Sequence, residues 1–282
     1  MGRKVSTNPL DRASVFARKW VEGFVQGLRP PAILSRFNGP RIFINSVPKA
    51  GTHLLETTLA QFPQLRFSGR PTVTGWSDDH RTRVQQALRR IRRGSFRSGH
   101  SRYWPELRQT IVERQIKVIQ MIRDPRDVIV SQWKYVTQIN LVHKEGRALR
   151  AAADTDKLLC MIEGIPGAIS PLGDVWKAHR GWLSFPEVLV VRFEELIGPR
   201  GGGTRELQMN ALARIARHLG ISADTELLEL VGRNLFSERS ATFRQGRIAA
   251  WREELHPEHK AAIKRHLGSL LVELGYEKDQ DW

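Results

Sequence analysis

Residues 41–59, with the sequence RIFINSVPKAGTHLLETTL, decide the fold. A short β-prone apolar run leads into the turn 48–52 (PKAGT), and apolar residues then resume at helical spacing. A strand, a glycine-bearing turn and a helix N-terminus together present backbone N–H groups to an anion. Lys49 adds a positive charge, and Thr52 adds a hydroxyl where the first helical turn needs a cap. Because the lysine precedes the glycine, we predict a phosphate-like site unlike the nucleoside-triphosphate loop, with an ordinary strand-to-helix turn as the alternative.

The charge of the chain limits its partners. Among 282 residues, Lys and Arg outnumber Asp and Glu by 45 to 29, which gives a formal net charge of +16. This excess favours a polyanionic partner such as a phosphorylated cofactor, an acidic glycan, nucleic acid or an anionic membrane. A basic enzyme that merely tolerates its charge is the alternative. Cys160 is the only cysteine, which excludes an intrachain disulfide and a cysteine-based zinc site and favours a reducing compartment.

Strands and helices alternate along the rest of the chain. Residues 116–122 (IKVIQMI) and 187–193 (EVLVVRF) predict buried strands, and residues 96–100 predict a short one. Residues 62–79 are turn-rich, and Pro105 is expected to break the chain. Helices are expected at 79–93, from 125 onward, and at 175–183, 205–219, 224–230 and 256–274. The pattern predicts an α/β fold with a central parallel sheet covered by helices on both faces.

The N-terminal part is expected to be an extension, residues 1–38, before a single domain at 39–282 with a helical insertion or lid around 140–172. Residues 10–28 have the spacing of an amphipathic helix, which Pro30 should end. We expect it to dock on the core, with attachment to an anionic membrane as the alternative. No apolar run approaches the ~18 residues of a membrane span, and no secretory signal is visible, so we expect a cytoplasmic protein.

Three segments should meet at the carboxyl ends of the strands, where open α/β sheets bind ligands. They are the Lys49 turn, Arg123 with Ser131 eight residues later, and the run 244–246 (RQG). In the last, an arginine beside a glycine lets the backbone approach an anion. Two anion sites suit a nucleotide that carries phosphates at both ends.

These motifs resemble the PAPS-dependent sulfotransferases over roughly residues 40 to 276. The turn 48–52 is similar to their 5′-phosphosulfate loop, and 123–131 (RDPRDVIVS) is similar to their 3′-phosphate motif. Residues 191–196 (VRFEEL) resemble the strand end that follows, and 243–251 (FRQGRIAAW) resemble a late segment of the family. The resemblance implies a P-loop-like nucleotide-binding fold, PAPS as sulfuryl donor and PAP as product. The cofactor-binding residues it implies are Lys49, Ala50, Gly51, Thr52, His53, Arg123, Ser131, Phe193, Arg244, Gln245 and Gly246.

The chain departs from the family pattern at several positions. Ala50 replaces a serine, Leu54 replaces a tryptophan that often stacks on adenine, and Ala250 replaces an aspartate. We expect cofactor binding to survive with altered adenine packing. A degenerate member that binds the nucleotide without transfer, or a polyanion-binding protein, is the alternative function. No nucleic-acid module is recognised, so no specific nucleic-acid partner is expected.

The resemblance also implies the catalytic groups. Lys49 and the nearby amides should face the negative charge that grows on the departing phosphate. His100 is the candidate base for the acceptor proton, since its place before Arg123 is similar to that of the family's catalytic histidine. Glu56 is the rival base, and His53 and His80 are weaker rivals. No metal is expected.

The acceptor is expected to carry a hydroxyl or an amine and to be a glycan, a lipid or a small alcohol. The basic stretch 81–102 lies between the turn and His100, so its arginines favour an anionic acceptor. Trp76, Tyr103 and Trp104 instead favour a flat aromatic or apolar alcohol.

Overall fold

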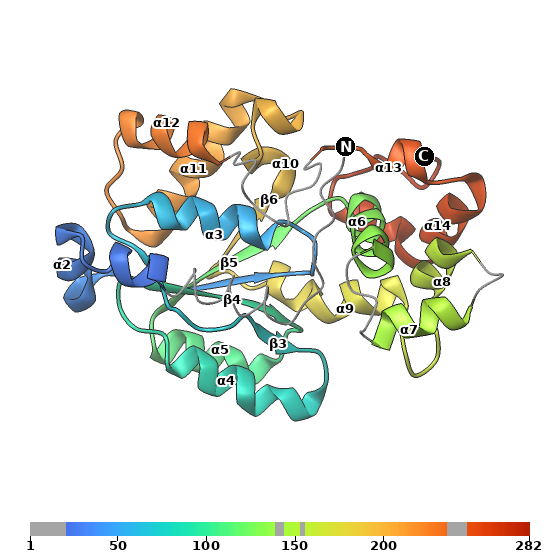
Figure 1. Ribbon diagram of the computed structural model, residues 1–282, viewed down its shortest axis with the longest axis horizontal. Helices are drawn as coiled ribbons and strands as arrows, with labels where there is room; N and C mark the ends of the chain where they lie inside the picture. The colour runs from blue at the N-terminus through green and yellow to red at the C-terminus, as the bar shows by residue number, and fades with distance from the viewer. Residues whose placement is uncertain (1–20, 139–143, 153–155, 236–246) are drawn as a thin grey trace. The chain divides into compact units, whose positions relative to one another are not determined.

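The chain forms two compact units in a computed structural model that describes residues 21–138, 144–152, 156–235 and 247–282 (Figure 1). The sheet unit contains the described residues 21–122 and 179–235. The helical unit contains the described residues 123–138, 144–152, 156–178 and 247–282. The domain boundary expected between residues 38 and 39 stays a prediction.

The sheet unit is built on six parallel strands in the order β2-β4-β1-β5-β6, with β3 paired to β4. The strands are β1 (Arg41–Ser46), β2 (Arg66–Phe67), β3 (Val73–Gly75), β4 (Ser95–Ser101), β5 (Ile116–Ile122) and β6 (Val188–Arg192). The register sets Arg41 opposite both Ser95 and Ile116, so the central strands begin at one level. Strand β1 is buried from both sides, as its apolar run predicts.

Helices cover both faces of this sheet, as predicted. Figure 1 shows α3 (Thr52–Gln61) on one face, with α4 (Arg81–Arg89) and α5 (Pro105–Glu113) on the other. Phe43, Leu88 and Trp182 belong to the core packed under α4 and α5. The remaining elements of this unit are α2 (Pro30–Asn38), η1 (Asp78–His80), α10 (Phe193–Leu196), η2 (Pro199–Gly201), α11 (Arg205–Leu219) and α12 (Thr225–Asn234).

Two prolines begin helices that were not expected. The helix that includes residues 21–26 ends before Pro30, as expected, but Pro30 is also the first residue of α2. Pro105, which was expected to break the chain, is the first residue of α5. Proline suits this position because its fixed φ matches the helix and its missing N–H would be unpaired there. The turn-rich stretch 62–79 also contains the short strands β2 and β3. The helix expected over 10–28 is described only from residue 21, and residues 21–26 are helical.

The helical unit contains α6 (Pro125–Gln138), α7 (Lys144–Ala151), α8 (Lys157–Glu163), α13 (Trp251–Glu254) and α14 (Pro257–Glu273), while α9 (Leu172–Leu183) has residues in both units. α7 and α8 lie within the residues expected to form a helical insertion or lid, and that role stays a prediction. Asp156 caps α8 through the N–H groups of Leu158 and Leu159. Its other carboxylate oxygen lies 2.8 Å from His259 Nε2 of α14. These contacts fix α8 on α14.

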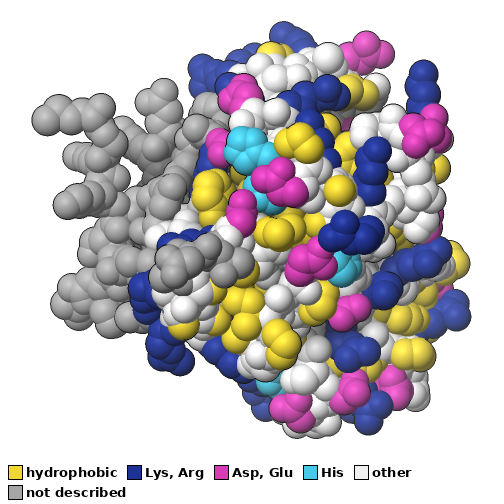
Figure 2. All heavy atoms as spheres, turned by 90° about the vertical axis from the view of Figure 1, so that its right-hand side faces the viewer, with side chains coloured by type: hydrophobic (Ala, Val, Ile, Leu, Met, Phe, Trp, Pro, Cys, Tyr) yellow, Lys and Arg dark blue, Asp and Glu magenta, His cyan; other side chains and the backbone are white. Residues whose placement is uncertain are grey.

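Acidic, basic and histidine side chains are interspersed on the face that carries α7, α8 and α14 (Figure 2). On this surface Glu163 contacts both Arg265 and His266. Within the residues that the structure describes, no helix is both long and apolar enough to cross a lipid bilayer.

Candidate active site

The Lys49 turn connects β1 to α3 at the carboxyl edge of the sheet. Gly51 is the N-cap of α3, and Thr52 is the first helical residue. The expected capping role of Thr52 is therefore wrong, because its hydroxyl lies 2.6 Å from Ser46 Oγ instead. Since the N-cap makes no side-chain hydrogen bond, no capping group competes with an anion for the first amides of α3.

The backbone of this turn adopts unusual conformations. Lys49 has a φ of 70°, which is uncommon for a residue other than glycine, and Gly51 has a φ of 111°. A Cβ on Gly51 would lie 2.8 Å from Met121 Cε and 2.8 Å from Phe193 Cδ2. The position therefore requires glycine. Phe193 itself is buried, and its ring packs against the turn.

Ser46 joins the turn to His100. Its hydroxyl lies 2.6 Å from Thr52 Oγ1 and 3.2 Å from His100 Nδ1, while its carbonyl oxygen lies 3.0 Å from the same nitrogen. Because a carbonyl oxygen only accepts, His100 Nδ1 carries the proton and Nε2 presents a lone pair. Burial lowers the pKa of His100 to about 4, so the imidazole is neutral at pH 7.

Glu56 lies on α3 in a buried position and is held by two partners. Its Oε1 accepts a 2.6 Å hydrogen bond from Ser98 Oγ, and its Oε2 lies 2.9 Å from His53 Nδ1. The His53 ring is half exposed. The negative charge of Glu56 acts to raise the pKa of His100, against the larger effect of burial. The two rival bases therefore influence each other electrostatically.

A buried polar network ties the ends of three strands together. Asn45 Nδ2 donates to the Ser101 carbonyl at 3.0 Å and to Gln120 Oε1 at 2.9 Å, and Ser101 N–H donates back to Asn45 Oδ1 at 2.9 Å. Trp182 Nε1 donates to the same Ser101 carbonyl at 2.9 Å. Sequence reasoning missed this network, although polar residues at the ends of apolar strands were its visible signal. It fixes β4 beside β1 and so fixes the level of His100.

The second predicted anion site lies in the helical unit. Arg123 directly follows β5, two residues before α6, and is buried, with a side-chain N–H donating to the Arg247 carbonyl at 3.1 Å. Asp127 is 3.6 Å from Arg123, and its two oxygens accept 2.9 Å hydrogen bonds from the N–H groups of Ala249 and Trp251. Burial raises the pKa of Asp127, against the opposing effect of Arg123. The segment that follows residue 246 is thereby held on α6.

Ser131, the expected partner of Arg123, is half-buried on α6. It lies eight residues after Arg123, about 12 Å along a helix axis. Arg126 is the fixed member of this motif, since its guanidinium contacts Asp124 and lies 4.0 Å from the Trp251 ring centre. Arg126 is thus structural, which leaves Arg123 and Ser131 as the candidates for binding.

The remaining predicted residues are the run 244–246, His80 and the arginines of residues 89–93. Arg244, Gln245 and Gly246 lie outside the described residues. His80 is in η1, where its Nδ1 accepts a 3.3 Å hydrogen bond from Trp76 N–H. Four of the arginines from which an anionic acceptor was inferred lie at the opposite end of β4 from His100; these are Arg89, Arg90, Arg92 and Arg93.

One group among the described residues could offer three metal-ligand atoms: Asp156, Glu258 and His259, whose atoms lie within 4.8 Å of one another. Asp156 already caps α8 and contacts His259, so the side chains of Asp156 and His259 have structural roles that do not require a metal.

Comparisons with known proteins identify the family. A family model described as a sulfotransferase domain matches residues 39–275. A search of the curated proteins found no match. The solved structure of mouse sulfotransferase SULT7A1 complexed with PAP matches with a TM-score of 0.58 at 18% identity, over 84% of this chain and 87% of that chain. Retinol dehydratase in complex with androsterone and inactive cofactor PAP matches with a TM-score of 0.56 at 15% identity, over 86% and 85%.

At these identities the solved structures show the shared fold, a central parallel sheet flanked by helices. The family model covers most of the chain and confirms the resemblance inferred from the motifs. This protein belongs to the sulfotransferase domain family.

Proposed function

We propose that this sulfotransferase uses PAPS and transfers its sulfuryl group in line to a hydroxyl or amine of an acceptor, with His100 as general base. The family match supports sulfuryl transfer, and the PAP in the two solved structures supports the choice of donor. The observation that carries the proposal is the chain of contacts from Thr52 through Ser46 to His100, which links an anion-binding turn to a neutral imidazole.

The turn fits the 5′ end of this nucleotide. Lys49 and the first amides of α3 would bind the phosphate that becomes the leaving group, and Gly51 lets the backbone approach it. When bound, PAPS supplies the sulfuryl group. Arg123 and Ser131 would hold the 3′-phosphate, with Arg123 oriented by Asp127 and the Arg247 carbonyl. A guanidinium held in this way is ready for two-point binding of a phosphate.

His100 is suited to accept the proton of the acceptor. The hydrogen bond from Nδ1 to the Ser46 carbonyl fixes the tautomer in which Nε2 is the base. With a pKa of about 4 in the free protein, the base is in its neutral form at pH 7. The negative charge of a bound donor would raise this pKa and strengthen the base. Glu56 would act on the reaction through its field at His100.

The acceptor side favours a hydroxyl on an apolar body. β3 pairs with β4 so that Thr74 lies opposite His100, and Trp76 follows β3 with its indole 38% exposed. The Trp76 ring lies 5.4 Å from the His179 ring. By contrast, Arg93 and His100 are separated by the length of β4, roughly 20 Å at ~3.3 Å per residue. The arginines of residues 89–93 therefore do not favour an anionic acceptor. A cytoplasmic location, with reduced Cys160, is part of this proposal.

An acceptor screen with sulfur-labelled PAPS tests the proposal on three proteins: wild type, His100→Asn and His218→Asn. His218 is the matched control, because burial lowers its pKa and its Nε2 lies 3.0 Å from a backbone carbonyl, that of Val118. We expect His100→Asn to lose about 10²–10⁴-fold in rate with PAP affinity retained, and His218→Asn to keep its rate.

Transfer by His100→Asn at the wild-type rate would exclude His100 as the base. PAP binding without transfer to any acceptor would instead favour a degenerate nucleotide-binding protein.

A further inference from the structure

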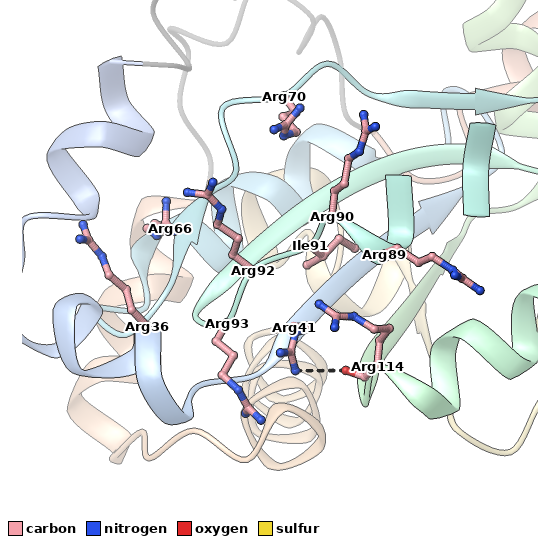
Figure 3. Close-up of a pocket in the computed structure, with 10 residues that line it drawn as sticks. All are labelled: Arg36, Arg41, Arg66, Arg70, Arg89, Arg90, Ile91, Arg92, Arg93 and Arg114. Carbon is pink, nitrogen blue, oxygen red and sulfur yellow. Dashed lines mark hydrogen bonds between the residues drawn. The ribbon is translucent and has the colours of Figure 1, made fainter. Parts of the chain in front are cut away.

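Nine arginines surround one cavity at the amino edge of the sheet, opposite the carboxyl edge that carries His100. The cavity has a volume of about 640 Å³, and Ile91 is the only other residue that lines it. Figure 3 shows these side chains coming from α2, the starts of β1 and β2, the loop between β2 and β3, the end of α4, and the loops before β4 and β5. The arginines are Arg36, Arg41, Arg66, Arg70, Arg89, Arg90, Arg92, Arg93 and Arg114.

The sheet register explains why the arginines meet. Arg41 and Arg66 are the first residues of β1 and β2, and both lie level with Ser95, the first residue of β4. Arg93 and Arg114 each come two residues before the next strand begins. Since parallel strands start at the same edge, arginines at strand starts are brought side by side however far apart they lie in the sequence.

The charges in this cavity are not neutralised by acidic side chains of the described part of the chain. None of the nine arginines forms a salt bridge there, although Arg36 donates to the Gly27 carbonyl and Arg41 to the Arg114 carbonyl. The Nε atoms of Arg41, Arg66 and Arg114 are buried and have no hydrogen-bond partner among these residues.

Mutual repulsion is visible in two of the side chains. Burial lowers the pKa of Arg41, and the charges of Arg114 and Arg93 lower it further. Burial also lowers the pKa of Arg66, with Arg36 and Arg92 adding to the effect. Bringing a multivalent anion to this cavity would relieve the repulsion and supply the missing acceptors.

An apolar surface adjoins this cavity. Helix α2 buries Ala32 and Ser35, while Leu34 is 67% and Phe37 79% exposed. Arg36, which lies between them in the sequence, lines the cavity. The preceding residues 21–28, of which 21–26 are helical, add further exposed apolar side chains, those of Val21, Val25 and Leu28. Large exposed apolar side chains near a basic cluster are typical of proteins that lie on a bilayer surface.

We propose that this edge of the sheet unit docks on an anionic phospholipid bilayer. The arginine cavity binds lipid phosphates, and Leu34, Phe37 and the apolar side chains of 21–28 enter the boundary between headgroups and acyl chains. The same orientation would leave the carboxyl edge, roughly 20 Å away along the strands, outside the lipid.

The test uses the full chain with vesicles of phosphatidylcholine alone or mixed with phosphatidylglycerol, in a sedimentation assay. Wild type should bind the anionic vesicles much more tightly, and binding should weaken as salt is raised. Neutralising three arginines (Arg90→Gln, Arg92→Gln and Arg93→Gln) should weaken binding on the order of 100-fold, at about fivefold per charge.

Two further variants separate charge from apolar insertion. The control (Arg217→Gln, Arg233→Gln and Lys278→Gln) removes the same charge from exposed positions elsewhere and should bind like wild type. Replacing Leu34 and Phe37 by Gln, both highly exposed, should weaken binding by at least about 10-fold without lowering the unfolding temperature.

Three results would overturn the proposal. Equal loss in the control and the arginine variant would mean that net charge alone drives binding. Full binding by the Leu34/Phe37 variant, or tight binding of inositol hexakisphosphate with no preference for anionic vesicles, would mean a soluble anion site. Dimers that disappear in the Leu34/Phe37 variant, seen by light scattering without vesicle binding, would mean that a second copy covers the surface.

Discussion

The two edges of the parallel sheet concentrate positive charge in opposite ways. At the carboxyl edge, Ser46, Thr52 and His100 are joined by short contacts, and the positive potential comes from Lys49 and the start of α3. At the amino edge, nine arginines crowd one cavity without an acidic partner among the described residues. The first arrangement fixes one group at one position, whereas the second attracts charge over a wide area. A catalytic site requires groups that are held in place before the substrate binds, whereas a docking surface requires only a high density of charge.

Replacing Lys49 by glycine should give the largest loss of activity. The same variant also separates backbone strain from function at the carboxyl edge, because it removes the charged side chain and allows the positive φ. We expect kcat to fall about 10²–10³-fold, since a donor to the leaving phosphate is lost. We also expect the free energy of unfolding to rise by about 0.5–1 kcal/mol, because glycine tolerates the φ of 70° at this position. Transfer kinetics and urea unfolding of the same preparation measure both effects. A fall in both activity and stability would show that Lys49 mainly supports the fold.

The pH dependence of stability tests the burial of His100. The pKa of His100 is about 6.5 in the unfolded chain and about 4 in the folded chain. Below pH 6.5 the unfolded chain therefore binds a proton at His100 that the folded chain does not bind. The stabilisation is complete above pH 6.5 and is lost as the pH falls toward 4, by about 3 kcal/mol. Urea unfolding of wild type and His100→Gln between pH 7 and 4.5 measures it. Parallel curves for the two proteins would contradict a His100 that stays neutral in the folded chain at these pH values.

Gly51→Ala should damage the turn by a smaller amount. The added methyl would meet Met121 and Phe193 at 2.8 Å in a backbone with a φ of 111°, which costs about 1–3 kcal/mol of stability. Gly167→Ala is the matched control, since Gly167 also has a positive φ but no atom within 4 Å of the new methyl. Thermal unfolding of both proteins separates the clash from the backbone strain. Equal losses would show that the contacts with Met121 and Phe193 do not matter.

Arg92→Gln should give the smallest effect, and with the opposite sign. Removing one charge near Arg66 relieves repulsion at the amino edge and should raise the free energy of unfolding by about 0.5 kcal/mol at low salt. The gain should vanish at high salt, where these charges are screened. Arg217→Gln, at an exposed position on α11, should show no gain. Destabilisation by Arg92→Gln would mean that the arginines are held by contacts rather than crowded against one another.

The sequence predicts most of the fold because its strongest patterns are local. Residues 116–122 form β5 and residues 205–219 form α11 at the predicted bounds, since each pattern matches a single period over its whole length. The helices that begin at Pro30 and Pro105 were missed because proline both ends and starts helices. The choice depends on whether the residues that follow can bury an apolar side, as Leu107 and Ile111 do in α5.

The candidate site could be predicted only in part. The turn and His100 follow from motifs, but Ser46 contacts His100 across 54 positions and Ser98 contacts Glu56 across 42. Such contacts depend on strand order and register, which local patterns do not contain. The same limitation explains the arginines at 89–93. Their place in the sequence suggested that the acceptor is anionic, but the parallel register places them at the amino edge of the sheet.

Calorimetric titration of the full chain with PAP tests the central claim, that the Lys49 turn binds the 5′ end of an adenosine bisphosphate. We predict saturable binding at one site per chain, weakened at least about tenfold by Lys49→Ala and unchanged by Lys278→Ala at an exposed control position. No measurable binding by well-folded wild type, or equal binding by all three proteins, would contradict it.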